Sequence, residues 1–84
     1  MITVYTKFGC STCDATKLYL ARHKVDFLEV NMDLDSAARA FVERLGYAAA
    51  PVVVAGAEHF SGFRPDRLLA LSCATDDIDS AVID

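Results

Sequence analysis

The fold of this 84-residue chain is decided by the stretch YTKFGCSTC, residues 5–13. A short run of β-forming residues ends here, a glycine follows at position 9, and two cysteines, Cys10 and Cys13, stand at the start of a helical pattern. In an intracellular protein, a Cys-x-x-Cys pair at a strand-to-helix junction is typical of a dithiol redox site. We therefore expect the rest of the chain to form a scaffold around these two thiols.

The spacing of the two cysteines suits thiol–disulfide exchange. Residues i and i+3 lie on the same face of a helical turn, so the two Cβ atoms come within the roughly 3.5–4.5 Å that a disulfide requires. Cys10 stands at the positive end of the helix dipole, which favours its thiolate and lowers its pKa, and Lys7 adds positive charge nearby. We predict that Cys10 is the attacking nucleophile and that the deeper Cys13 is the resolving thiol.

Two other interpretations of the cysteine pair stay open. It could be half of a zinc or iron–sulfur site, or two unrelated core thiols. A metal site usually needs a second pair of ligands, and the remaining candidates, His23, His59 and Cys73, are isolated in the sequence, although a dimer could supply four thiols. The redox interpretation is favoured, and we expect no metal and no cofactor besides the redox-active disulfide.

Composition and charge narrow the range of partners. Residues 1–71 carry eight basic and eight acidic side chains, whereas residues 72–84 carry four Asp and no Lys or Arg, so the net charge of −4 arises from the tail. A balanced body with an acidic tail argues against nucleic-acid binding. The apolar runs are too short to cross a membrane and no signal-peptide pattern is present, so we expect a cytoplasmic protein with no membrane partner, and a monomer.

Hydrophobic periodicity predicts an α/β protein with the element order βαβαββα. Strands are predicted over residues 2–6, 26–31, 51–55 and 58–60, and helices over 11–23, 36–45 and from 64 onward. Two crossover units require parallel pairing and a closing hairpin requires one antiparallel pair, which predicts a four-stranded mixed sheet flanked by three helices. The dithiol then lies at the carboxyl end of the first strand. Residues 1–71 form the redox domain and residues 72–84 an acidic tail, with Cys73 a bystander at the boundary.

The same periodicity predicts which side chains face the core. The second strand alternates around Leu28 and Val30. Helical stripes account for the other predicted core residues, which are Leu18, Tyr19, Leu20, Ala21 and Val25; Ala38, Phe41, Val42 and Leu45; and Leu68, Leu69 and Leu71.

Three segments of the chain resemble one known family. The first is ITVYTK, residues 2–7, leading into C-x-x-C-x-ATK; the second is LGY, residues 45–47, leading to APVVVAG; the third is SGFRPD, residues 61–66. Together they resemble the NrdH-redoxins, glutaredoxin-like members of the thioredoxin superfamily. The third segment is the most specific, because ordinary glutaredoxins carry a Gly-Gly-x-x-Asp glutathione-binding pattern there.

The resemblance implies a thioredoxin-like fold and a thiol-disulfide oxidoreductase. Members of this family donate electrons to class Ib ribonucleotide reductase and receive them from thioredoxin reductase rather than from glutathione. A glutathione-dependent glutaredoxin is the alternative, since Lys7 and the Pro51 loop would suit a glutathione carboxylate and backbone. The missing Gly-Gly-x-x-Asp pattern counts against that alternative.

The resemblance also implies roles for residues around the dithiol. Pro51 should be a cis-proline that faces the dithiol, and the backbone of Ala50 should pair with an extended substrate segment. The last loop would be tied down, in the space where glutathione would sit, by Ser61, Gly62, Phe63 and Arg64.

The chain departs from the family close to the dithiol. Phe8 stands where many members have Pro or a polar residue, and Ser11-Thr12 stands where Val-Gln is usual. Phe8 is either an exposed aromatic platform for the partner or a loop residue packed on Tyr47 or Phe63. The residues expected to contact the substrate beside the cysteines are Lys7, Phe8, Ser11 and Thr12.

Overall fold

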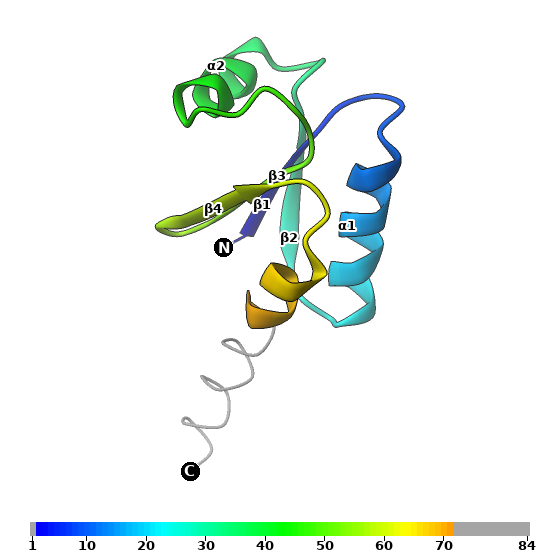
Figure 1. Cartoon of the computed structure of the whole chain (residues 1–84). Coiled ribbons are helices and arrows are strands. Elements are labelled where there is room, and N and C mark those ends of the chain that lie inside the picture. Colours follow the sequence, from blue (N-terminus) through cyan, green and yellow to red (C-terminus); the bar gives the residue numbers. More distant parts are fainter. Residues whose placement is uncertain (1, 72–84) are drawn as a thin grey trace.

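The computed structural model describes residues 2–71 and has the predicted order of elements (Figure 1). These are β1 (Ile2–Thr6), α1 (Ser11–Arg22), β2 (Phe27–Asn31), α2 (Ser36–Arg44), β3 (Val52–Ala55) and β4 (Glu58–Ser61), followed by a helix from residue 65 to the end of the described chain. The tail and Cys73 lie outside the described residues, so the predictions made for them stay predictions.

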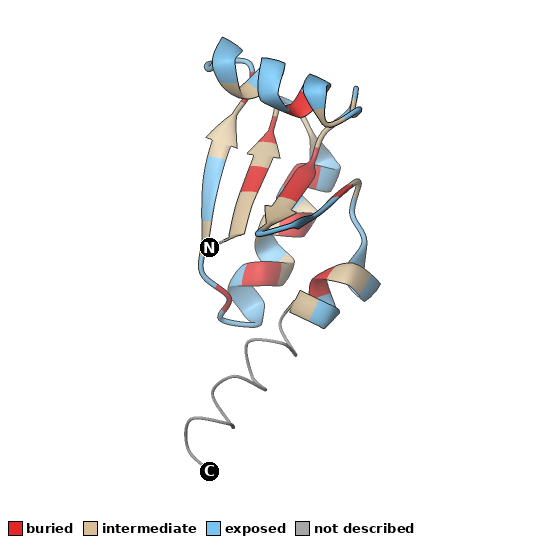
Figure 2. Ribbon diagram, turned by 90° about the vertical axis from the view of Figure 1, so that its left-hand side faces the viewer, coloured by how far each residue is buried: buried red, intermediate tan, exposed pale blue. Residues whose placement is uncertain are grey.

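The four strands form one mixed sheet in the order β2-β1-β3-β4, which confirms the predicted fold class. The predicted strand directions were wrong at one connection. β1 pairs in parallel with β2, but β3 runs antiparallel to β1 and to β4. The reason is visible in Figure 2, where α2 lies across the end of the sheet at which β2 finishes, so the chain enters β3 from that same end instead of returning to the opposite one.

This reversal brings two distant segments to the same edge of the sheet. Tyr5, near the end of β1, pairs with Val52, the first residue of β3. The loop that follows β1 and carries Cys10 therefore lies at the edge where Ala50 and Pro51 lead into β3.

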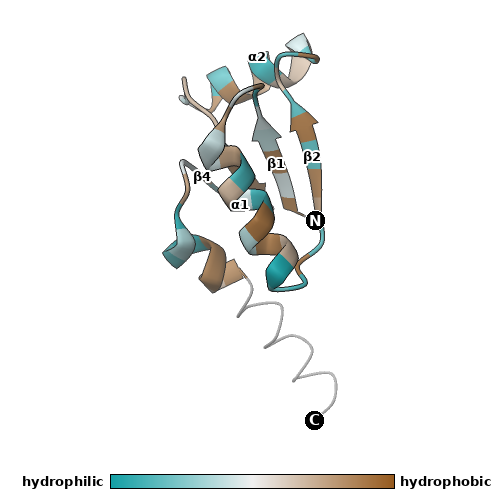
Figure 3. Ribbon diagram, turned by 90° about the vertical axis from the view of Figure 1, so that its right-hand side faces the viewer, coloured by the Kyte–Doolittle hydropathy of each residue, from teal (hydrophilic) through white to brown (hydrophobic). Residues whose placement is uncertain are grey.

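Two apolar clusters cover the opposite faces of the sheet. Val53 is fully buried and belongs to the cluster under α1 and the helix 65–71, whereas its neighbour Val52 is fully buried and belongs to the cluster under α2. Successive strand residues point to opposite faces, so the run of valines in β3 is buried on both sides, as predicted. Figure 3 shows α1 lying over its face of the sheet. Leu20 of α1 and Leu68 of the last helix are packed in the cluster on that face.

The core stripe predicted for α1 was wrong in part. Leu20 and Val25 are buried, but Leu18 is 52% exposed and Ala21 is exposed. The buried positions of α1 are Cys13, Thr16 and Leu20. The inward stripe therefore begins at Cys13 and includes a threonine, which hydropathy alone assigns to the surface.

Other exposed residues were also predicted to be core. Leu28 is 55% exposed because β2 is an edge strand, and Leu69 is 46% exposed because the last helix presents Leu68 to the core. Phe41 of α2 is 39% exposed, with its ring 5.7 Å from that of Tyr5. Within residues 2–71, no helix is both long enough and apolar enough to cross a membrane.

Candidate active site

Cys10 is the N-cap residue of α1. Gly9 precedes it with φ +65°, a conformation that glycine adopts without strain, and Cys10 itself is extended. The Cys10 sulfur accepts a hydrogen bond from the backbone N–H of Cys13 at 3.1 Å, and the Cys10 carbonyl accepts one from Asp14 at 3.2 Å. The sulfur therefore occupies the place of a capping oxygen, where a backbone N–H and the helix dipole favour negative charge.

The two cysteines form a disulfide with a Cα–Cα distance of 5.2 Å. Their environments differ, because Cys10 is partly exposed whereas Cys13 is 1% exposed. An incoming thiolate can reach the sulfur of Cys10 far more easily than that of Cys13. The predicted division into an attacking and a resolving thiol requires such an asymmetry, and the two roles stay predictions.

The two residues between the cysteines, Ser11 and Thr12, are exposed in the first turn of α1. The hydroxyl of Thr12 lies 3.4 Å from the Cys10 sulfur, and its carbonyl accepts a hydrogen bond from the buried hydroxyl of Thr16 at 2.9 Å. Thr12 thus supplies a hydroxyl beside the sulfur, while its contact with a substrate stays a prediction. The buried Thr16 was missed because hydropathy assigns a threonine to the surface.

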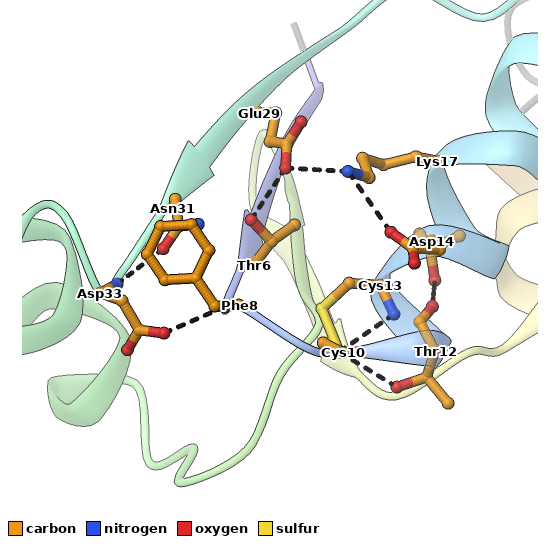
Figure 4. A network of polar contacts seen from close by, with 11 residues as sticks. Thr6, Phe8, Cys10, Thr12, Cys13, Asp14, Lys17, Glu29, Asn31 and Asp33 are labelled. Atoms are coloured by element: carbon orange, nitrogen blue, oxygen red, sulfur yellow. Dashed lines mark hydrogen bonds and ion pairs between the residues drawn. A yellow bond between two sulfur atoms is a disulfide. The ribbon is translucent and has the colours of Figure 1, made fainter.

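A polar network beside the dithiol also escaped the sequence analysis (Figure 4). Glu29 on β2 accepts hydrogen bonds from the buried Thr6 of β1 and from Lys17 of α1, both at 3.0 Å, and Lys17 also lies 3.6 Å from Asp14. The hydrogen bond from Lys17 is the main reason that the pKa of Glu29 lies below its ordinary value, and the same bond raises the pKa of Lys17. These residues belong to three elements, so only the folded chain brings them together.

The loop between β1 and α1 presents an aromatic side chain to the surface. Phe8 is 65% exposed, and its backbone N–H donates to the carboxylate of Asp33 at 3.0 Å. The rings of Tyr47 and Phe63, on which Phe8 could have packed, instead contact His59 and Tyr19. Of the two alternatives, the exposed one describes Phe8; its contact with a partner stays a prediction.

Lys7 is half-buried in the same loop and lines a small hollow of about 90 Å³. Arg39, Tyr47, Ala48 and Ala49 line it as well, so two cations meet residues that directly precede Ala50. Lys7, one of the predicted substrate contacts, therefore shares this hollow with a second cation, Arg39.

The peptide bond between Ala50 and Pro51 is cis, as the resemblance implied. The carbonyl of Pro51 accepts a hydrogen bond from the N–H of Gly62 at 2.8 Å. Within residues 2–71, no hydrogen bond involves the backbone of residues 48–50. The polar groups of Ala50 are therefore available for an extended peptide, at the edge of the sheet that carries Cys10.

The segment 61–64 lies beside this loop and is held mainly through its backbone. Gly62, with φ +83°, makes the bond to Pro51, and the carbonyl of Arg64 accepts from the N–H of Leu68 at 2.9 Å, so the segment joins the loop to the last helix. Ser61 ends β4, the ring of Phe63 lies edge-on to Tyr19 at 6.2 Å, and the Arg64 side chain lies 3.6 Å from the Asp66 carboxylate. Their roles toward a substrate or glutathione stay predictions.

The arrangement of the two cysteines suits thiol–disulfide exchange. In the described part of the chain, no group of three or more His, Cys, Asp or Glu side chains is arranged to hold a metal ion. The chemistry on hand is that of two thiols with unequal access, a helix N-terminus and a nearby hydroxyl.

The sequence and the structure were compared with those of known proteins. The glutaredoxin family model matches residues 2–60. The glutaredoxin-like protein NrdH of Lactococcus lactis subsp. cremoris is 39% identical over 72 residues, covering 86% of this chain and all of the relative, and that of Escherichia coli K12 is 39% identical over 67 residues, covering 80% and 83%. The solved structure of NrdH-redoxin from Escherichia coli, described as having a thioredoxin-like activity profile, superimposes with a TM-score of 0.81 at 38% identity, covering 83% of this chain and 92% of that one.

The solved Escherichia coli structure has the same fold as this chain, and the chain carries a disulfide-bonded Cys-x-x-Cys pair at the N-terminus of its first helix. The protein therefore belongs to the glutaredoxin family, among the NrdH-redoxins, and is a thiol-disulfide oxidoreductase.

Proposed function

We propose that this protein is a cytoplasmic electron donor to a class Ib ribonucleotide reductase and is itself reduced by thioredoxin reductase. The observation that carries the proposal is the unequal access to Cys10 and Cys13 beside an unpaired backbone edge at Ala50. That combination suits an extended protein segment containing a disulfide. The similarity to NrdH proteins, one of which is described as having a thioredoxin-like activity profile, supports this choice of partners.

The reaction follows from the placement of the two sulfurs. In the reduced protein the Cys10 thiolate attacks one sulfur of the substrate disulfide; that bond breaks, a Cys10–substrate disulfide forms, and the released thiolate takes a proton. Cys13 then loses its proton and attacks the Cys10 sulfur, which expels the second substrate thiolate and closes the Cys10–Cys13 disulfide. Two electrons pass to the substrate, and thioredoxin reductase returns two.

The chain's own groups assist both steps. The N–H of Cys13 and the hydroxyl of Thr12 stabilise negative charge on the Cys10 sulfur, which is the attacking group in the first step. Burial of Cys13 keeps the second thiol from external disulfides until the mixed disulfide has formed. The backbone of Ala50 would align the substrate as an added strand, and Lys7, Phe8, Ser11 and Thr12 would contact it around the sulfur.

A glutathione-dependent reaction is the second candidate, and one observation favours it. Lys7 and Arg39 line the same hollow next to the loop that leads to Pro51, and two cations there would suit a glutathione carboxylate. Arg39 already lies 4.0 Å from the carboxylate of Asp33, and Glu43 also lines the hollow. These two acidic side chains weaken the attraction of the hollow for an anion.

An NADPH-consumption assay on a protein disulfide separates the two candidates. One reaction contains thioredoxin reductase, and the other contains glutathione with glutathione reductase. We expect turnover only in the reaction that contains thioredoxin reductase. Turnover only in the reaction that contains glutathione and glutathione reductase would refute the proposed reductant. Arg39→Ala should leave the first reaction unchanged, and Arg44→Ala, which removes an exposed cation from the same helix outside the hollow, is its matched control.

Two cysteine variants test the division of labour. Cys10→Ser should abolish turnover, because it removes the proposed attacking thiolate at the N-terminus of α1. Cys13→Ser should accumulate a mixed disulfide between Cys10 and the substrate, detectable by non-reducing electrophoresis. Activity of Cys13→Ser equal to wild type on protein disulfides would show that the two-thiol mechanism is wrong.

A further inference from the structure

Tyr47 and His59 make a polar contact that the reaction above does not use. The Tyr47 hydroxyl oxygen lies 2.7 Å from Nδ1 of His59 and 3.2 Å from its carbonyl oxygen, and the two rings meet edge-on with centroids 5.5 Å apart. Both contacts are hydrogen bonds when the Tyr47 hydroxyl donates to the carbonyl and Nδ1–H of His59 donates to the hydroxyl oxygen. The contact joins the segment after α2 to β4, the strand at the edge of the sheet.

The segment that follows Tyr47 has few other attachments. Residues 48–50 are all alanine, Ala48 and Ala49 are exposed, and no backbone hydrogen bond within residues 2–71 holds any of the three. Ala50 packs against the apolar cluster of Met32, Val42 and Val52, and among the described residues the hydrogen bonds that hold the segment lie at its two ends. At one end Gly62 donates to the Pro51 carbonyl, and at the other the N–H of Tyr47 donates to Val42 at 3.3 Å while its hydroxyl binds His59.

We propose that Tyr47 and His59 are positioning residues that fix residues 48–50 in the place where a protein substrate pairs with Ala50. The inference rests on the proposed use of Ala50 as a substrate-binding edge. An alanine segment with no internal hydrogen bonds samples several conformations unless its ends are fixed. In most of these conformations the substrate backbone would no longer be aligned with the Cys10 sulfur. The pair acts on binding of extended peptides and leaves the exchange chemistry of Cys10 unchanged.

The reaction itself offers a test that separates positioning from general stability. The probes are a protein disulfide, which needs the Ala50 edge, and the symmetric disulfide of thionitrobenzoate, a small chromogenic compound with no backbone to pair. Electrons come from whichever reductase the wild-type protein accepts. Tyr47→Phe keeps the ring in its apolar cluster and removes only the hydroxyl, and His59→Ala removes the partner.

We expect His59→Ala, which loses the hydrogen bond to Nδ1, to raise KM for the protein disulfide on the order of two- to tenfold, and Tyr47→Phe, which loses both hydrogen bonds of the hydroxyl, to raise it at least as much. Neither variant should change kcat or the rate with the small disulfide by much. His59→Asn, whose side-chain amide can donate from nearly the same place as Nδ1, should recover most of the loss. The matched control is Tyr19→Phe, since the Tyr19 ring stacks on His23 at 4.3 Å and its hydroxyl has no hydrogen-bond partner within residues 2–71.

Two results would overturn the inference. One is an unchanged KM for the protein disulfide in Tyr47→Phe and His59→Ala. The other is an equal loss with both substrates, which would make the contact a matter of stability alone. Failure of the proposed function is seen separately, in the wild-type protein, as absence of protein-disulfide turnover with thioredoxin reductase.

Discussion

Replacing Leu68 and Leu69 in turn by alanine tests how the last helix packs. Leu68 has no exposed surface and belongs to the cluster with Leu20 and Val53, whereas its neighbour Leu69 is 46% exposed. The two changes are chemically identical, so their difference reports burial alone. Periodicity predicted both residues to face the core, and the structure says that only one of the pair is fully buried.

The expected magnitudes follow from the buried surface. Leu to Ala removes three carbons, worth about 2.4 kcal/mol at roughly 0.8 kcal/mol per buried methylene, and the cavity left at a closed site raises the cost of Leu68→Ala to about 3 kcal/mol. About half of the Leu69 side chain is already in water and no closed cavity forms, so Leu69→Ala should cost about 1 kcal/mol or less. A domain of this size has a total stability of roughly 4–13 kcal/mol, so the first change removes a large part of it.

Urea unfolding of the oxidised protein, followed by far-ultraviolet circular dichroism, measures both costs. We expect the free energies of unfolding of the two variants to differ by about 2 kcal/mol, which corresponds to a melting-temperature difference of roughly 8–16 °C in a domain of 60–100 residues. Equal losses of stability, or a larger loss for Leu69→Ala, would refute the packing of this helix described here. They would also question how the helix anchors the segment 61–64 through the hydrogen bond from Leu68 to Arg64.

Three further changes probe the scaffold around the dithiol. The pKa of Glu29 is lowered and that of Lys17 is raised by their shared hydrogen bond, so their stabilisation is present between the ordinary values of 4.5 and 10.5 and is lost as the pH falls through the lowered pKa of Glu29 or rises through the raised pKa of Lys17. Lys17→Met should therefore cost less than about 1 kcal/mol near neutral pH, because the pair is partly exposed, and urea titrations in strong acid should show no difference from wild type. Asp35→Ala removes the side-chain acceptor for the N–H of Ala38 at the start of α2 and should cost about 1 kcal/mol in urea unfolding, whereas Asp35→Asn, which keeps an acceptor, should cost clearly less; equal costs would contradict the capping role. Gly62→Ala meets no atom within 4 Å but must hold φ at +83°, so thermal unfolding should show a loss of about 1–2 kcal/mol, and an unchanged melting temperature would argue against that backbone conformation.

Local patterns predicted the parts of the site that are close in sequence. Cys10 and Cys13 lie on one helical turn, and the preceding strand and glycine place them at its N-terminus, so the disulfide, the N-cap position and the unequal depth of the sulfurs follow from a stretch of nine residues. The order of elements and the doubly buried strand at Val52 and Val53 were also predictable, because hydrophobic periodicity reports secondary structure and burial directly.

Features that depend on how elements meet were not predictable. The direction of β3 depends on the end of the sheet at which the chain leaves α2, and no local sequence pattern specifies that end. Burial of Thr16 and exposure of Leu18 depend on the rotation of α1 against the sheet, which is a compromise among all the side chains of the cluster. An edge strand such as β2 alternates like an inner one, so Leu28 looked buried from its neighbours alone.

The amino-acid sequence by itself determined the chemistry of this protein, because two cysteines three residues apart and the helix N-terminus that carries them are properties of one short segment. The tertiary structure decided what surrounds that chemistry: the Thr6–Glu29–Lys17 network, and the contact of Tyr47 with His59 at the end of an unpaired alanine segment. These contacts join residues twelve or more positions apart, and such pairs form only when the sheet closes, since their energies depend on distances that no local conformation sets.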